Sequence, residues 1–310
     1  MSLPSRIVFM GTPEFALASL DALLAAGSRP SAVFTQPDKP AGRGHALTPP
    51  PVKRRALEQG LEVRQPKSLK DPEVIAELRA LGPEVVVVAA YGKILPPSVL
   101  EIPPLGCVNV HASLLPRHRG ASPIAHAIWA GDAEVGVSIM RMEAGLDTGP
   151  VYRSRSLPAP KDATTGTLTS VLARLGADLL IETLKGLREG VLEARSQNEG
   201  LATLAPRLRT EQGRLDFTRP AVELERQIRA FDPWPGTYFE VSGERIKVLS
   251  ATLGPPTRQT PGEVLPGREF CIACGNGDSL LLGTIQRAGK RPLPASEVLH
   301  GFKIPPGSKI

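Results

Sequence analysis

Cysteine is scarce in this chain of 310 residues, which holds only Cys107, Cys271 and Cys274. Three cysteines are too few for a disulfide framework. Cys271 and Cys274 have the C-x-x-C spacing of a metal site, but a tetrahedral zinc site needs further ligands and the chain has no second cysteine pair. We therefore expect no bound metal, and we interpret both residues as small apolar side chains of a strand.

Long apolar runs are also missing. No run approaches the roughly 20 residues of a membrane-spanning helix, and the first residues lack the apolar segment of a signal peptide. Aromatic residues make up only 4% of the chain, so a platform of side chains for stacking on nucleic-acid bases is not evident. We expect a soluble, cytoplasmic protein without a membrane partner.

Neither sign of charge is in large excess, since the net charge is +6. That balance allows a polyanionic partner without requiring one. A length of 310 residues, of which 41% are hydrophobic, is enough for two domains that each bury a core.

The pattern of residues 1–190 predicts a Rossmann-like fold. Residues 6–10 have the character of a strand, and residues 11–14 form a turn in which a threonine can cap a helix and a proline suits its first position. The turn lacks the G-x-G-x-x-G fingerprint, so a bound dinucleotide is not predicted. The unbroken apolar run at 85–90 is typical of a strand covered on both faces. We predict an α/β domain with a doubly wound, mostly parallel sheet.

The remainder of the chain has a different character. The polar residues 195–200 are typical of a connection between domains, and we place a linker at residues 191–206. From residue 207 onward, short strand-like pieces alternate with turns such as Ser242-Gly243. We predict a small OB-like β-barrel domain at residues 207–310.

Three polar residues are candidates for catalysis. Asn109 and His111 end a predicted strand at 105–111, two residues apart and therefore on the same face. Asp147 follows a second strand-like run at 135–142. Open α/β sheets bind ligands at the carboxyl ends of their strands. We therefore expect an amide, an imidazole and a carboxylate to converge on one pocket.

These groups suit acyl transfer to a nucleophile that the substrate brings. Asn109 would donate a hydrogen bond to a developing oxyanion, His111 would hold or move a proton, and Asp147 would orient the imidazole or accept a proton. The alternative interpretation is a buried asparagine and histidine that cap loop backbone, with Asp147 as a turn residue.

Residues 36–48 form a connection much longer than the roughly two to six residues usual in α/β units. Its prolines and glycines disfavour regular structure, so we expect a mobile loop with a functional role. Lys39, Arg43 and Lys53 belong to a basic stretch in and beside this loop. Such a stretch favours contact with a phosphate backbone.

The candidate site has the motifs of a known family. The residues Asn109-Val-His111, Ser113-Leu-Leu-Pro116-Arg-His-Arg119-Gly120 and Leu146-Asp147-Thr-Gly149 resemble the signature of the formyltetrahydrofolate-dependent formyltransferases. The resemblance extends over nearly the whole chain. Ala112 and His118 depart from the usual residues, which affects only the expected shape of the loop.

The resemblance implies formyl transfer from 10-formyltetrahydrofolate without a metal. It implies that Asn109 and His111 stabilise the tetrahedral intermediate, while Asp147 manages the protons of the imidazole and the attacking amine. Contacts with the folate are implied for Ser113, Leu114, Leu115 and Pro116.

Further motifs at 11–15, 35–44 and 229–236 are similar to those of family members that formylate methionine on initiator tRNA. The resemblance implies that initiator methionyl-tRNA is the partner and that Arg43, with its loop, meets the acceptor end. We expect a monomer. An alternative is a family member that acts on a sugar-nucleotide or glycinamide ribonucleotide amine. A non-catalytic RNA-binding protein is a second alternative, which the three catalytic candidates argue against.

Overall fold

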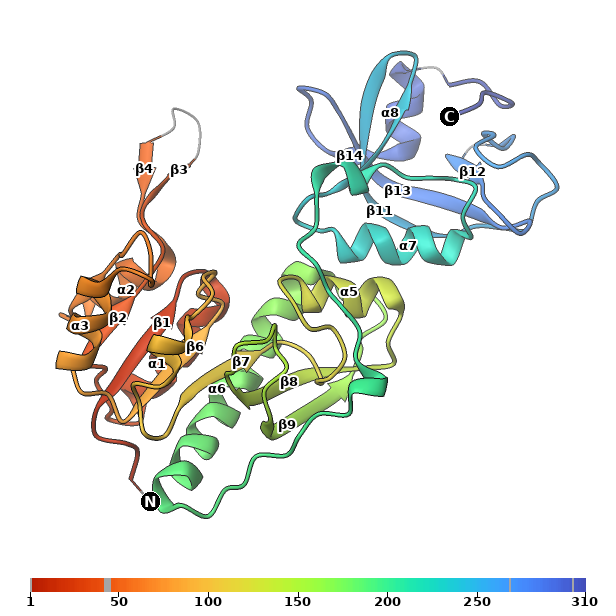
Figure 1. Ribbon diagram of the computed structural model, residues 1–310. Helices are drawn as coiled ribbons and strands as arrows, with labels where there is room; N and C mark the ends of the chain where they lie inside the picture. The colour runs from red at the N-terminus through yellow and green to blue at the C-terminus, as the bar shows by residue number, and fades with distance from the viewer. Residues whose placement is uncertain (1, 42–45, 268, 303) are drawn as a thin grey trace. The chain divides into compact units, whose positions relative to one another are not determined.

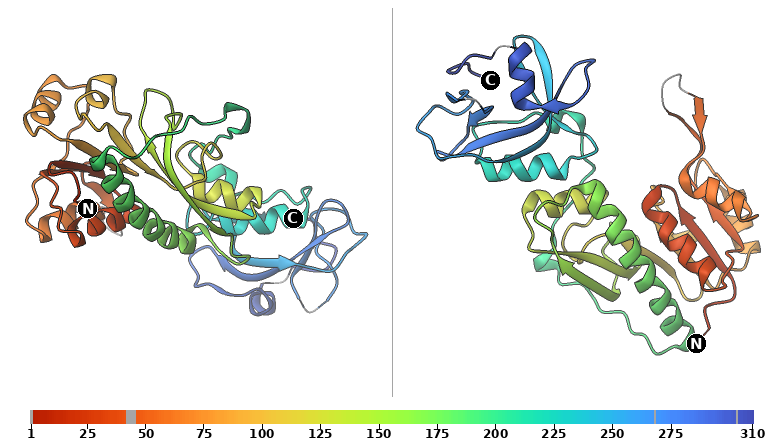
Figure 2. Two further views of the ribbon diagram at one scale, coloured as in Figure 1. Left: turned by 90° about the horizontal axis from the view of Figure 1, so that it is seen from below. Right: turned by 180° about the vertical axis from the view of Figure 1, so that it is seen from behind.

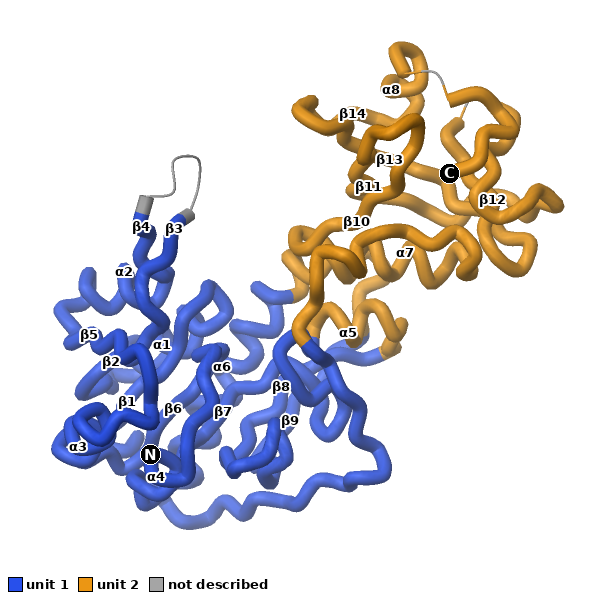
Figure 3. The backbone as a smooth tube through the Cα atoms, turned by 45° about the horizontal axis from the view of Figure 1, so that its top comes forward, with its two compact units in different colours: residues 1–123, 134–158, 169–206 blue, residues 124–133, 159–168, 207–310 orange. Residues whose placement is uncertain are grey.

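The computed structural model of the chain describes residues 2–41, 46–267, 269–302 and 304–310. The chain divides into two compact units (Figure 3). Unit 1 comprises residues 1–123, 134–158 and 169–206, and unit 2 comprises residues 124–133, 159–168 and 207–310. Each unit has its own sheet, and each is described by itself.

Unit 1 is built on a seven-stranded sheet with the order β5-β2-β1-β6-β7-β8-β9 (Figures 1 and 2). The strands are β1 (Ile7–Gly11), β2 (Ala32–Phe34), β5 (Val63–Arg64), β6 (Val85–Ala89), β7 (Cys107–His111), β8 (Glu134–Arg141) and β9 (Val151–Pro158). The first five strands in this order are parallel, while β8 and β9 pair antiparallel. The predicted α/β fold with a mostly parallel sheet is confirmed.

Helices cover both faces of this sheet (Figure 2). They are α1 (Glu14–Ala25), α2 (Pro51–Glu58), α3 (Pro72–Ala80), α4 (Pro97–Leu100) and the unit 1 part of α6 (Thr165–Glu189). Val86 and Val88 of β6 pack in a core with side chains of α3 and α4. On the opposite face α6 comes so close that a Cβ at Gly176 would lie 2.8 Å from Val110. Because both faces are covered, β1 and β6 are buried at every position.

The connection between β2 and α2 contains two strands, so the expectation that the prolines and glycines of residues 36–48 disfavour regular structure was wrong. β3 (Lys39–Ala41) pairs antiparallel with β4 (Ala46–Thr48) as a two-stranded ribbon that projects from unit 1 (Figure 1). A proline cannot donate to a strand ladder, but Pro40 is tolerated because each strand of an isolated ribbon has a free edge. Arg43 lies outside the described residues.

Unit 2 is built on a five-stranded antiparallel sheet with the order β10-β11-β13-β12 and β14 beside β13. The strands are β10 (Thr237–Val241), β11 (Glu244–Leu253), β12 (Cys271–Ala273), β13 (Ser279–Arg287) and β14 (Leu293–Pro294), and the helices are α5 (Pro123–Ala130), η2 (Thr210–Gly213), α7 (Ala221–Ala230) and α8 (Ala295–Gly301). Leu224 and Ile228 of α7 share a core with Phe239, Ile246 and Ile285 of the sheet. The predicted small C-terminal β domain is confirmed.

All three cysteines are buried free thiols, and Cys271 opens β12. Burial raises the pKa of Cys107 and of Cys274 to about 12. Among the described residues, no group of three or more His, Cys, Asp and Glu side chains is placed to hold a metal ion. Within the same residues, every helix is too short or too polar to cross a bilayer.

Candidate active site

Strand β7 carries Asn109 and His111 to the carboxyl end of the parallel part of the sheet. Its register pairs Asn109 with Val88 of β6 on one side and with Met140 of β8 on the other. The two polar residues are 9% and 5% exposed. Polar groups buried this deeply need hydrogen-bond partners, from the protein or from a ligand, to offset their lost hydration.

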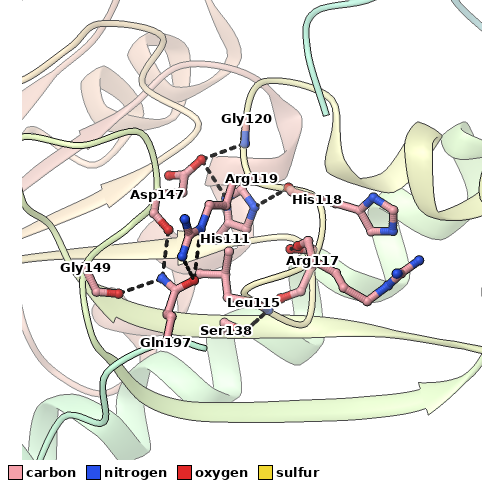
Figure 4. Close-up of polar contacts among 11 residues, drawn as sticks. His111, Leu115, Arg117, His118, Arg119, Gly120, Ser138, Asp147, Gly149 and Gln197 are labelled. Atoms are coloured by element: carbon pink, nitrogen blue, oxygen red, sulfur yellow. Dashed lines mark hydrogen bonds and ion pairs between the residues drawn. The ribbon is translucent and has the colours of Figure 1, made fainter. Parts of the chain in front are cut away.

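The His111 imidazole has a partner at each nitrogen (Figure 4). Nε2 lies 2.9 Å from the carbonyl oxygen of His118, so Nε2 is the donor in this pair. Nδ1 lies 3.6 Å from Asp147 Oδ2. In a neutral imidazole with its hydrogen on Nε2, Nδ1 is the basic nitrogen. The nitrogen with the free lone pair is therefore the one that faces the carboxylate.

Asp147 lies in the connection between β8 and β9. Its position is constrained by the backbone N–H of Gly120 and by the turn at Gly149. The Oδ2 atom that faces His111 also accepts a hydrogen bond from Gly120 N at 2.8 Å. The φ angle of Asp147 is 52°, in the left-handed region that aspartate tolerates better than most residues. At Gly149 a Cβ would lie 1.9 Å from the carbonyl oxygen of Arg141, so only glycine fits this turn. The structure thus brings Asp147 and His111 together.

The Asn109 carboxamide differs from these two groups, because no hydrogen bond joins it to any described residue. A carboxamide that is 9% exposed and lacks a protein partner has its donor available for an oxygen atom of a ligand. Its place on β7, two residues before His111, puts that donor beside the imidazole.

The loop of residues 113–116 is held by Ser138, a fully buried residue of β8. Ser138 Oγ donates to the carbonyl oxygen of Ser113 at 2.8 Å and accepts from Leu115 N at 3.0 Å. The Ser113 hydroxyl donates to the carbonyl oxygen of Arg117 at 2.6 Å, so it serves the loop itself. Leu114, Leu115 and Pro116 are half-buried, which leaves part of their apolar surface accessible to a ligand.

Comparisons with known proteins place these residues in a family. A family model described as formyl transferase matches residues 5–184, and one described as the formyl transferase C-terminal domain matches residues 207–303. The chain belongs to the formyl transferase family.

One curated relative, the methionyl-tRNA formyltransferase of Pseudomonas fluorescens, is 49% identical over 302 residues, which cover 97% of this chain and 94% of the relative. The N-formyltransferase of Helicobacter canadensis superposes with a TM-score of 0.66 and 17% identity, over 92% of this chain and 100% of that one. HypX of Aquifex aeolicus gives a TM-score of 0.60 and 19% identity over 96% of this chain, which spans 49% of HypX. At such identities the two structures show a shared fold.

In this formyltransferase a segment that we call the strap, residues 195–205, runs along the loop that follows β7. Arg195 exchanges two backbone hydrogen bonds with Val151 at the start of β9, each 2.8 Å long. Further along the strap, which includes η1 (Glu199–Leu201), Thr203 Oγ1 accepts from His118 N at 2.9 Å. The strap therefore holds His118, whose carbonyl oxygen is bonded to the imidazole of His111.

Arg119 is a buried cation, only 5% exposed, between this loop and the strap. Its guanidinium forms hydrogen bonds of 2.8 and 2.7 Å with Glu199 and of 3.1 and 2.9 Å with Gln197 Oε1. The hydrogen bond to Glu199 raises the pKa of Arg119 and lowers that of Glu199. Sequence reasoning did not select Arg119 or Gln197 for the site, because their contact joins residues 78 positions apart.

The base of the β3–β4 ribbon has a polar network of its own. Lys53 Nζ lies 2.9 and 2.8 Å from the two carboxylate oxygens of Asp38 and 2.7 Å from Gln65 Oε1. The hydrogen bond from Lys53 lowers the pKa of Asp38. Lys39 is exposed and begins β3, opposite Thr48. Lys53 thus ties the ribbon to α2, while Lys39 faces solvent.

Proposed function

We propose that this formyltransferase transfers the formyl group of 10-formyltetrahydrofolate to the α-amine of methionine on initiator tRNA, for translation initiation. The observation that carries the proposal is the arrangement of three groups. His111 Nδ1 faces the Asp147 carboxylate, and the Asn109 carboxamide has no partner among the described residues. The identity of 49% with a methionyl-tRNA formyltransferase along 302 residues supports this choice of acceptor.

Formyl transfer needs an oxyanion donor and a proton acceptor, and the substrate supplies the nucleophile. The methionine amine attacks the formyl carbon, so a carbon–nitrogen bond forms and negative charge develops on the formyl oxygen. Asn109 donates a hydrogen bond to that oxygen. The proton that leaves the amine passes to His111 Nδ1, where Asp147 stabilises the imidazolium. When the intermediate collapses, the bond between the formyl carbon and N10 of the folate breaks, and N10 takes up the proton held by His111, which returns the imidazole to its neutral form.

We assign the folate contacts to Ser113, Leu114, Leu115 and Pro116. The hydrogen bonds from Ser138 hold the backbone of this loop in one conformation. A loop that is held before the substrate arrives loses little conformational entropy on binding.

The proposed tRNA contacts are Lys39, Arg43 and Lys53, together with the domain at residues 207–310. In this division of labour, residues 1–190 form the catalytic domain and residues 191–206 connect it to the tRNA-binding domain. Lys39 is exposed and suits a phosphate contact. Lys53 already binds Asp38, so it contributes chiefly by holding the ribbon in place. The enzyme acts in the cytoplasm as a monomer.

The decisive experiment is an assay of formyl transfer from 10-formyltetrahydrofolate to methionyl initiator tRNA. Uncharged tRNA, an amino-sugar nucleotide and glycinamide ribonucleotide serve as parallel acceptors. We expect formyl transfer to the charged tRNA alone. Transfer to one of the small amines, with none to the charged tRNA, would replace the proposed function with that of another formyltransferase.

A further inference from the structure

Gln197, in the strap, is bonded to the turn that carries Asp147 (Figure 4). Its Nε2 donates to the carbonyl oxygen of Asp147 at 2.8 Å and to that of Gly149 at 2.7 Å. A carboxamide nitrogen has two hydrogens, and these bonds use both. One side chain therefore holds the main chain on both sides of Thr148.

Arg119 sets the orientation of this carboxamide. Gln197 Oε1 accepts from Nε of Arg119 at 3.1 Å and from Nη2 at 2.9 Å. A rotation of the amide by half a turn would put Oε1 against two carbonyl oxygens and Nε2 against a cation. Both hydrogens and both lone pairs of the Gln197 carboxamide are occupied, so it has a single favourable orientation.

Arg119 also lies in the sequence between two residues whose backbone groups bond to His111 and Asp147. The carbonyl oxygen of His118 accepts from His111, and the N–H of Gly120 donates to Asp147. The backbone N–H and carbonyl oxygen of Arg119 both bond to the strap. The main chain of Arg119 thus helps to place the imidazole, while its side chain acts on the carboxylate through Gln197.

We propose that Gln197, oriented by Arg119, is a positioning residue that holds Asp147 at its working distance from His111. The inference rests on the proposed function, because it assigns a role to the carboxylate. Asp147 has a positive φ in a turn without regular secondary structure, so its side chain points at Nδ1 only while the backbone is held. A misplacement of about 1 Å at a reacting group can cost on the order of 10²-fold in rate.

The substitution Gln197→Glu tests this role in the full-length enzyme. Glutamate keeps an acceptor for Arg119 but replaces the donor with an oxygen that repels the two carbonyl groups. We expect kcat with charged initiator tRNA to fall on the order of 10²-fold, while KM for the tRNA and Kd for the folate stay at the parent values. Gln197→Met removes the donor without adding charge and should lower kcat in the same way. If the glutamate variant does not fold, the methionine variant tests the positioning role in its place.

Asn198→Asp is the matched control, since it makes the same change from amide to carboxylate one residue along the strap. Asn198 is exposed and only accepts a hydrogen bond, from Gly200 N, which aspartate also accepts. Parent-like kcat is expected for this variant. A Gln197 variant as active as Asn198→Asp would overturn the inference, and so would equal losses in folate binding, KM and melting temperature.

A double-mutant cycle with Asp147→Asn separates the two proposals. If Gln197 acts through the carboxylate, Gln197→Glu has little further effect in the Asp147→Asn background. Additive losses would overturn the positioning role. An inactive Asp147→Asn beside a fully active Gln197→Glu would overturn the inference alone. Parent-like activity of Asp147→Asn would overturn both the proposed catalytic role and the inference.

Discussion

Asp147 and His111 are related through a single carboxylate oxygen. Oδ2 of Asp147 lies 3.6 Å from His111 Nδ1, and the same atom accepts the hydrogen bond from Gly120 N. Because Gly120 N is a fixed donor, it also determines which atom an asparagine at position 147 would turn toward it. The amide oxygen would face Gly120, and no negative charge would remain beside the imidazole.

Asp147→Asn is therefore expected to lower kcat by about 10²- to 10⁴-fold, the range typical of a lost acid–base group. The substitution preserves size, so the melting temperature should stay near that of the parent. Asp162→Asn, at an exposed position of unit 2, is the control for the loss of one carboxylate. Steady-state kinetics across the neutral pH range check this, and a parent-like rate throughout would remove the carboxylate from the mechanism.

Asn109→Ala is expected to lower kcat by roughly 10²- to 10³-fold, because it removes one donor to the developing oxyanion. Folate affinity should be little changed, since the donor acts mainly in the transition state. Equilibrium folate binding and single-turnover rates measure the two effects separately. Asn198→Ala makes the same truncation at an exposed residue. Weaker folate binding with an unchanged turnover number would make Asn109 a ground-state contact.

Lys53→Met and Asp38→Asn should have the same effect, because each breaks the pair at the base of the ribbon. The side chains are 21% and 28% exposed, so solvent screens the pair, and kcat/KM for tRNA should fall by no more than roughly fivefold. The double variant should be no worse than either single variant. Lys70→Met, at an exposed lysine of unit 1, controls for lost charge. A silent Asp38→Asn beside an impaired Lys53→Met would show that Lys53 contacts the tRNA directly.

The buried thiol of Cys107 should make unit 1 sensitive to alkali. Burial raises its pKa from 9.0 to about 12, so above pH 9 the unfolded chain releases a proton that the folded chain retains. The contribution of the neutral Cys107 thiol to the free energy of unfolding is fully present below pH 9 and is lost as the pH rises toward 12. The free energy of unfolding falls over this range by at most about 1.4 kcal/mol per pH unit. Urea unfolding of the parent and of Cys107→Ala at several alkaline pH values tests this. The difference in stability should narrow as the pH rises, and a constant difference would contradict the prediction.

Much of the fold could be predicted because its signals are local. The apolar runs of β1 and β6 reflect burial on both faces. Asn109 and His111 share a face because alternate residues of a strand do. The meeting of Asp147 with His111 was expected from the rule that ligands bind at the carboxyl ends of parallel strands. Because β8 runs antiparallel to β7, however, it is the connection at 142–150, and not that rule, which brings Asp147 to the imidazole.

The residues that hold the site were not predictable in this way. Gln197 reaches Asp147 across 50 positions of sequence, and its segment is as polar as any surface connection. Ser138 is one hydroxyl in an apolar strand, with no local sign that it holds a loop from another strand. The ribbon at β3 and β4 was missed because the prolines and glycines of residues 36–48 argued against regular structure, whereas a ribbon with two free edges accepts Pro40.

The contacts of the strap determine where a domain chimera of this protein can be spliced. A chimera that takes its N-terminal part from this enzyme and is spliced at residue 190 would include Asn109, His111 and Asp147 but exchange the glutamine that holds the turn. A splice after Pro206, where the first compact unit ends, would keep them together. The segment that must be transferred intact is thus longer than the stretch of chain that contains Asn109, His111 and Asp147.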